Sequence, residues 1–431
     1  MSSTAIGSAI ASQFQFLSVL KIRDFRLFWL GLLAEVSGQS MMTFTIGWLA
    51  FDLTGSPLAL GYVQLASAGP RILLSQFGGV LADRLDQRQV VTVTQTVAAL
   101  TVGLLAYLVL TGQVRFWHLI VLPMVNGMAL AFDNPARQAL YPQLLPDRAR
   151  ILDAVPLVAS TWQLARVIAP AVAGYIIAFL GAGNSFLLAA FGFATMGFVV
   201  RFVRVSRVRS TSRGNVLQNL AEGARYAWGN PTFRLVIGMT YLSSIFGMGY
   251  LLMMPIFAKG VLGVGPDGLG LMLSAGGIGA VMGSLAGPRL IRRVPVGKML
   301  VVMLFLFGLL LAVFAFNRSF AFSLPLLSLL GLTSLMFLIS AESMVQALVE
   351  DHVRGRVMAF VTLTWTLNPL GAALLSAVAN FTSAPTALAA GATVVMLSAV
   401  VVGLSSKVIR NLGPIVVRPA QRPAETGTSA R

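Results

Sequence analysis

Long apolar stretches, separated by short connections that carry charge, glycine or proline, dominate this chain of 431 residues. The sequence is 57% hydrophobic and only 10% charged, with a mean hydropathy of +0.83. A soluble protein carries about 25% charged residues, so this composition belongs in a bilayer. One spanning helix needs about 20 apolar residues, and the chain therefore accommodates about twelve spans. We predict an all-α membrane protein.

The net charge of +17 has a better explanation than binding to nucleic acid. Lys and Arg gather in alternate connections, as the positive-inside rule requires of cytoplasmic loops. Tracing the spans in order places Arg115, Lys259 and Arg318 outside and Arg71 and Arg166 within the membrane. All the other basic residues then fall inside, which predicts that both termini are cytoplasmic.

Composition shifts divide the chain into five segments. Residues 1–26 form a cytoplasmic N-terminal segment, and 27–204 hold the first six spans. Residues 205–231 are arginine-rich and then apolar at helical spacing, which predicts a cytoplasmic linker with an amphipathic helix. Residues 232–408 hold six further spans. The tail, 409–431, is rich in Pro, Arg, Thr and Ser, and we predict that it is disordered.

An internal repeat supports two matched halves. Three short matches all lie 208 residues apart: Phe25-Arg26-Leu27 with Phe233-Arg234-Leu235, Gly79 with Gly287, and Gln138-Ala139-Leu140 with Gln346-Ala347-Leu348. Parallel repeats of this kind occur in transporters that hold substrate near mid-membrane, where the halves meet. We predict two pseudo-symmetric six-helix bundles.

A charged hinge between the second and third spans carries a family resemblance. Gly79, Asp83, Arg84 and Arg88 have the spacing of the loop between helices 2 and 3 of the major facilitator superfamily, which this segment resembles, although Asp86 stands where the family usually has glycine. Five other stretches resemble the branch of bacterial siderophore exporters and macrolide-efflux carriers: residues 25–29, 53–61, 133–140, 164–174 and 354–358. The resemblance implies a multi-pass transporter of the bacterial inner (plasma) membrane. It also implies that Gly79, Asp83, Arg84 and Arg88 form a gating loop, whereas a topogenic charge cluster is the alternative.

Charged side chains within the spans are the candidates for energy coupling, because lipid makes them costly. They are Glu35, Arg71, Asp133, Arg166 and Glu342. Helix rise places all five in one slab of the inner half of the protein. A carboxylate that alternates between an apolar site and an arginine can load and release a proton. We predict Glu35 as the coupling site, with Asp133 second and Glu342 third, and Arg71 and Arg166 as counter-charges.

These charged residues also have structural interpretations. Asp133 precedes Asn134 and Pro135 and could cap a kinked helix end. Arg166 could clamp two helices, and Glu342, near an inner helix end, could face water.

Other residues are candidates for helix 5 and for a substrate cavity. Pro170 and Gly174 resemble part of the helix-5 motif of antiporters, and helix bending with close packing is the alternative. The cavity should be apolar with a few polar points. Its candidates are Gln39, Phe44, Trp48, Trp162, Gln163, Tyr241, Tyr250, Trp365 and Asn368, each of which could instead be a packing residue.

The sequence favours transport over catalysis. It has no phosphate-cradling Gly-Lys-Ser/Thr loop, no metal-ligand cluster and no hydrolytic triad, so we expect no enzyme activity, no cofactor and a proton gradient as energy source. We predict a monomeric, proton-coupled exporter of a moderately hydrophobic, drug- or siderophore-like small molecule. A facilitator or importer of a small metabolite is the alternative within transport, and a non-transporting scaffold or receptor is the alternative of another class.

Overall fold

The structure is a computed structural model that describes residues 15–147, 150–204, 224–226, 228–350, 353–406, 409 and 413. Within these ranges, the side chains of residues 15–17, 76–84, 359, 362 and 365 fall outside the description. Most of the predicted tail, of the predicted N-terminal segment and of the predicted amphipathic linker lies outside the described residues.

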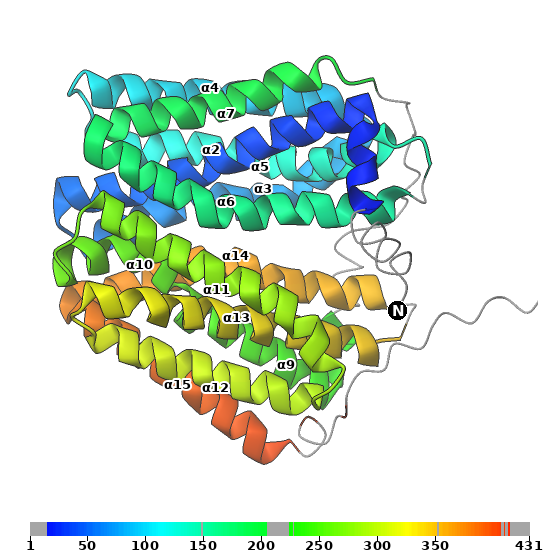
Figure 1. Cartoon of the computed structure of the whole chain (residues 1–431), viewed down its shortest axis with the longest axis vertical. Coiled ribbons are helices and arrows are strands. Elements are labelled where there is room, and N and C mark those ends of the chain that lie inside the picture. Colours follow the sequence, from blue (N-terminus) through cyan, green and yellow to red (C-terminus); the bar gives the residue numbers. More distant parts are fainter. Residues whose placement is uncertain are drawn as a thin grey trace, which may run out of the picture.

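Twelve long helical segments make up most of the described chain (Figure 1). The first six are α2 (Arg23–Thr54), α3 (Pro57–Arg84), α4 (Gln87–Leu110), α5 (His118–Leu140), α6 (Ile151–Leu180) and α7 (Ala182–Val200). The seventh is continuous over α9 (Pro231–Leu242), the π-helical turn η4 (Ser243–Met248), α10 (Tyr250–Pro255) and a second π-helical turn η5 (Ile256–Val261). The rest are α11 (Pro266–Ile291), α12 (Val296–Phe316), α13 (Phe320–Leu348), α14 (Arg354–Phe381) and α15 (Ala384–Ser405), with short 3-10 turns η1 (Gln15–Lys21) and η2 (Tyr141–Leu144).

Local sequence sets where several of these helices begin and end. Gly55 ends α2 in the left-handed region, with φ 62°, and its N–H donates to the carbonyl of Phe51. Asp86 caps α4, because its side chain accepts from the backbone N–H of Arg88. Ser383 and Thr386 form a capping box at the start of α15.

The helices form a multi-pass membrane protein. Nine segments of the described chain are long and apolar enough to cross a bilayer. The other three helices, α2, α3 and α14, have similar lengths and complete the two sets of six. Large apolar side chains point outward from the bundle, among them Leu100, Phe179 and Phe381, at 68%, 67% and 85% exposure. Such an outer surface fits hydrocarbon and not water.

Two six-helix bundles lie side by side, with α2 to α7 in the first and α9 to α15 in the second (Figure 1). The internal packing of the bundles corresponds: α3 packs on α5 as α11 packs on α13, and α4 on α7 as α12 on α15. The bundles contact each other mainly through α6 against α11 and α3 against α14, which are symmetry-related pairs. The predicted pair of pseudo-symmetric bundles is confirmed.

Contacts between the bundles occur at the end that holds the turns at Gly55, Gly181 and Gly263, here called the arginine-poor end. A Cβ on Gly174 would lie 2.3 Å from the carbonyl oxygen of Pro266, so α6 and α11 cross there with almost no space between backbones. Lys259 forms an ion pair with Asp52 across the same end. These contacts hold the two bundles together at the arginine-poor end.

Candidate transport site

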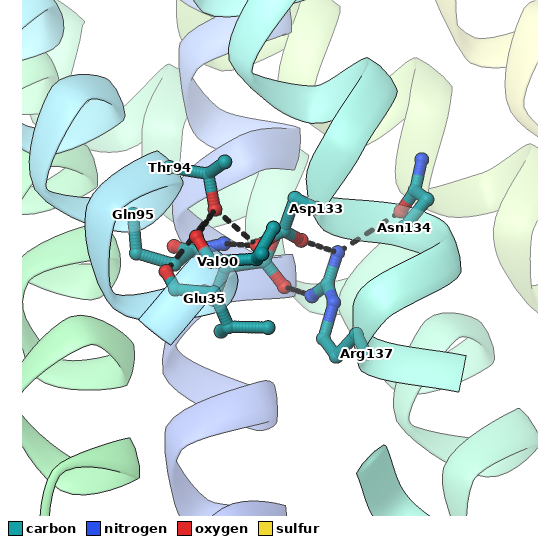
Figure 2. Close-up of polar contacts among 8 residues, drawn as sticks. Glu35, Val90, Thr94, Gln95, Asp133, Asn134 and Arg137 are labelled. Atoms are coloured by element: carbon teal, nitrogen blue, oxygen red, sulfur yellow. Dashed lines mark hydrogen bonds and ion pairs between the residues drawn. The ribbon is translucent and has the colours of Figure 1, made fainter. Parts of the chain in front are cut away.

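Three charged side chains meet inside the first bundle. Glu35 on α2 and Asp133 and Arg137 on α5 are almost completely buried, with exposures of 1%, 0% and 5%. Arg137 forms ion pairs with both carboxylates: Nη1 with Glu35 Oε2, and Nη2 with Asp133 Oδ2 at 2.6 Å (Figure 2). One guanidinium therefore ties α2 to α5.

Polar side chains of α4 complete the cluster (Figure 2). Thr94 Oγ1 donates to Asp133 Oδ1 at 2.9 Å, and Gln95 Nε2 donates to the same oxygen at 3.0 Å. Arg137 Nη2 also donates to Asn134 Oδ1 at 3.0 Å. Asp133 is thus held by donors from two helices, whereas Glu35 accepts from Arg137 and also interacts with Gln95.

Helical spacing explains why Asp133 and Arg137 meet. Residues four apart lie on one helix face, and α5 continues past Pro135 to Leu140. Asp133 is therefore in the middle of a helix, and the interpretation that it caps a kinked helix end is wrong.

The cluster has a fixed charge imbalance. Two carboxylates face one arginine, so with both carboxylates ionised it carries one net negative charge. Burying an ion costs several kcal/mol. Removing one partner of a buried ion pair destabilises a protein by about 3–5 kcal/mol. A single added proton removes the imbalance, which gives this site the chemistry of a proton acceptor.

The predicted counter-charges differ from the observed one. Arg71 and Arg166 were expected opposite Glu35 and Asp133, but the structure places Arg137 there. Arg71 lies on α3, and no described residue is within ion-pair range of it. Arg166 lines the central cavity and interacts electrostatically with Tyr250. Glu342 is half-buried on α13, apart from the cluster, and has no ion-pair partner among the described residues.

A central cavity of about 380 Å³ lies between the bundles. Of the predicted cavity residues, five line it: Gln39, Phe44, Trp162, Tyr250 and Asn368. Ser40, Thr43, Gln64 and Arg166 also line it, and Arg166 is the charged residue of the described lining. No residue of the buried cluster is in the described cavity lining, although Glu35 is next in sequence to Val36, which lines the cavity.

Three predicted cavity residues are not in the cavity lining. Trp48 is buried beneath Lys259, whose Nζ is 5.9 Å from the ring centroid. Tyr241 donates its hydroxyl to the carbonyl of Phe360 at 2.9 Å. Gln163 lies on α6 outside the cavity lining, so the prediction was wrong for these three. The side chain of Trp365 lies outside the described residues.

Only part of the predicted gating loop is described. The surroundings of Gly79 and the side chains of Asp83 and Arg84 fall outside the description, although helix α3 runs to Arg84. Arg88 donates from Nη2 to the carbonyl of Arg201 at the end of α7, a contact within the first bundle. Asp86, the departure from the family pattern, is the cap of α4.

Pro170 and Gly174 lie where α6 crosses α11. A Cβ on Gly270 would be 2.6 Å from the carbonyl oxygen of Pro170, and Gly174 faces Pro266 as described above. This geometry matches the close-packing interpretation of both residues.

Sequence reasoning missed Arg137, Thr94 and Gln95. Arg137 was counted with the basic residues of the inner loops, because it lies only three residues before the end of α5. The signal that could have found it is the four-residue spacing from Asp133, which places opposite charges on one helix face. Thr94 and Gln95 carry no comparable signal, since polar residues in a span are common.

The similar proteins include one named transporter and two efflux proteins. The chain is 24% identical over 339 residues to the staphyloferrin A transporter of Staphylococcus aureus, covering 78% of this chain and 84% of the relative. It is 24% identical over 354 residues to the multidrug efflux pump Tap of Mycolicibacterium fortuitum, covering 80% and 86%. It is 21% identical over 196 residues to macrolide efflux protein A of Streptococcus pyogenes, covering 46% and 47%.

Solved transporters share the fold. The nucleoside transporter NupG superposes with a TM-score of 0.71 at 16% identity, covering 88% of this chain and 98% of NupG. A bacterial homologue of the lysosomal transporter Spinster, solved inward-facing and unoccupied, gives 0.66 at 13% identity, covering 88% and 94%. The family described as transmembrane secretion effector matches residues 15–414, nearly the whole chain. Because that family model matches nearly the whole chain, this chain belongs to the transmembrane secretion effector family of the major facilitator superfamily.

Proposed function

We propose that this protein is a proton-coupled exporter of moderately hydrophobic, drug- or siderophore-like small molecules. The observation that carries the proposal is the buried Glu35–Arg137–Asp133 cluster in the first bundle, in a protein that also has a cavity between its bundles. Ionisable groups inside a membrane protein mark proton and substrate pathways. The efflux proteins among the similar proteins support the direction of transport.

In this proposal Glu35 binds and releases the proton, and Asp133 stays ionised. Hydrogen bonds to a charged group stabilise it, and Asp133 accepts from Thr94 and Gln95 in addition to its ion pair with Arg137. A proton that binds a carboxylate oxygen of Glu35 forms a neutral acid and leaves Arg137 paired with Asp133. The link between α2 and α5 then weakens, while the charge of the cluster falls to zero.

The cavity favours an amphipathic cargo. Its described lining is mostly apolar, with amide and hydroxyl groups and the cation of Arg166. Aromatic surfaces at Phe44, Trp162 and Tyr250 fit a hydrophobic body. Arg166 suits an anionic or strongly accepting group on that body.

The proposal includes alternating access, and the closure of one end supports it. Asp52–Lys259 and the α6–α11 crossing hold the arginine-poor end together. The positive-inside rule assigns that end to the outside, so this is the inward-facing state, in which cargo enters from the cytoplasm. The proposal places a monomer in the bacterial inner membrane with both termini in the cytoplasm.

Inside-out vesicles test this function. Vesicles from cells that make the protein, energised to an acidic lumen, should accumulate a labelled macrolide or a siderophore. Accumulation should collapse when a protonophore removes the gradient and should be absent in Glu35→Gln vesicles with equal protein content. Accumulation of polar metabolites alone would favour the facilitator, and no transport of any compound would favour a scaffold or receptor.

A further inference from the structure

Arg166 places a positive charge at mid-depth in the central cavity. It lines the cavity from α6, and it precedes Leu180, the last residue of that helix at the arginine-poor end, by 14 residues. At about 1.5 Å of rise per residue, Arg166 lies about 21 Å from that end. A charged side chain at this depth of a membrane protein is costly, and such residues mark the path of a substrate or an ion.

The described lining of the cavity holds no carboxylate. Apart from Arg166, its polar side chains are uncharged amide, hydroxyl and indole groups. Glu35 and Asp133 pair with Arg137 inside the first bundle and are not part of this lining, and neither is Glu342. The charge that the described lining carries is therefore positive. A cleft lined by one sign of charge concentrates ligands of the opposite sign.

The second bundle supplies a hydrogen-bond donor at the same depth. Asn368 lines the cavity from α14 and precedes Phe381, the last residue of that helix, by 13 residues, so it lies about 20 Å from the arginine-poor end. Ser244 donates its hydroxyl to Oδ1 of Asn368. The hydrogens of a side-chain amide are both on its nitrogen, so with Oδ1 engaged, Asn368 offers an occupant the donor group Nδ2.

We propose that the cargo carries an acidic group, ionised at neutral pH, which Arg166 binds from the first bundle and Asn368 from the second. A guanidinium can form two parallel hydrogen bonds with one carboxylate. A protonated amine has hydrogens only to donate and cannot accept them. The inference rests on the proposed function, because it names the charge class of that cargo. It narrows the cargo to acidic compounds and excludes those whose only charge is a basic amine.

Three fluorescent probes and the purified full-length protein test this without a transport assay. Dansylglycine, dansylamide and dansyl-ethylenediamine share one aromatic body, and at neutral pH they are an anion, a neutral molecule and a cation. Equilibrium dialysis, with empty detergent micelles subtracted, gives the affinity of each. Wild-type protein should bind dansylglycine about tenfold more tightly than dansyl-ethylenediamine, with dansylamide between them.

Variants of Arg166 locate the preference in the cavity. Arg166→Gln should remove the preference for the anion, and Arg166→Lys should keep part of it. Arg318→Gln is the matched control, because Arg318 is exposed at the arginine-poor end and is not in the cavity lining. The net charge of +17 also attracts anions to the surface. The titrations are therefore run in 1 M NaCl, where the Debye length is about 3 Å.

Equal affinities for the three probes, or tighter binding of the cation, would overturn this inference and leave the proposed exporter standing. So would a preference for the anion that Arg166→Gln leaves as strong as Arg318→Gln does. Failure of every probe to bind would count against the amphipathic cavity of the proposed function and against this inference together. If Arg166→Gln does not fold, the order of affinities in wild-type protein and in Arg166→Lys decides.

Discussion

Arg137 on α5 forms a buried ion pair with Glu35 on α2, and its second amino group reaches Asp133 one turn earlier on its own helix. This arrangement makes Arg137 the shared counter-charge of two carboxylates. The charge imbalance at a buried site is the physical basis of the proposed proton coupling, and it leads to several predictions.

Removing Arg137 should destabilise the protein, because it leaves two buried carboxylates without their cation. Arg137→Ala should lower the free energy of unfolding by about 3–5 kcal/mol. Thermal unfolding of the purified protein measures the change. Arg71→Ala is the matched control, since Arg71 has no ion-pair partner among the described residues, and an equal loss in both variants would contradict the assignment.

Neutralising the whole cluster should restore stability without restoring transport. The triple variant Glu35→Gln, Asp133→Asn, Arg137→Met exchanges three charges for uncharged side chains of similar volume, and replacing a complete buried ion cluster in this way is often neutral. We expect a melting temperature close to that of wild type and no gradient-driven export. A triple variant that still exports with wild-type dependence on the gradient would show that the cluster is only structural.

The crossing of α6 and α11 should not tolerate a side chain at Gly174. A Cβ there would meet the carbonyl oxygen of Pro266 at 2.3 Å, and backbone atoms cannot swing away. Gly174→Ala should destabilise the protein by about 1–3 kcal/mol and reduce export. Gly238→Ala is the control, since no atom lies within 4 Å of its Cβ position, and equal thermal shifts in both variants would rule out this packing role.

The Asp52–Lys259 pair should bias the protein toward the state seen here. Both side chains are about two-fifths exposed, at 42% and 44%, so the pair contributes only about 0.2–1 kcal/mol. Asp52→Asn should therefore modestly increase the fraction of the protein that is open at the arginine-poor end. The chain has no native cysteine, so Gln39→Cys in the cavity can report opening through its labelling rate with an impermeant maleimide.

In that assay, Arg318→Gln serves as the comparison, because Arg318 is an exposed cation at the same end without an ion-pair partner among the described residues. Faster labelling in Asp52→Asn than in Arg318→Gln is expected. Identical rates would mean that the ion pair does not hold this end closed.

The span pattern was largely predictable from sequence. Apolar runs bounded by Gly, Pro and charge predicted about twelve spans in two sets of six, and the described chain holds twelve long helical segments. A segment that crosses lipid must satisfy its own backbone hydrogen bonds, so it forms a helix. For this reason an apolar run in the sequence is enough to locate a span. The π-helical turns η4 and η5 were not predictable, because an apolar run looks the same whether its helix is regular or widened.

The site was predictable only in part. Glu35 and Asp133 stood out, since a carboxylate in an apolar run is conspicuous. Their partner did not, because Arg137 lies near the end of a span, where a topogenic arginine is expected too. Which cavity candidates face the cavity depends on helix rotation: Trp162 lines it, whereas its neighbour Gln163 does not.

Proton movement through Glu35 is the central claim, and a pH-sensitive dye inside proteoliposomes measures it directly. When a cargo gradient is imposed on wild-type protein, the account predicts an opposite flow of protons, which disappears in Glu35→Gln and persists in Glu342→Gln. Proton flow that survives in Glu35→Gln, or that is lost only in Glu342→Gln, would contradict the account.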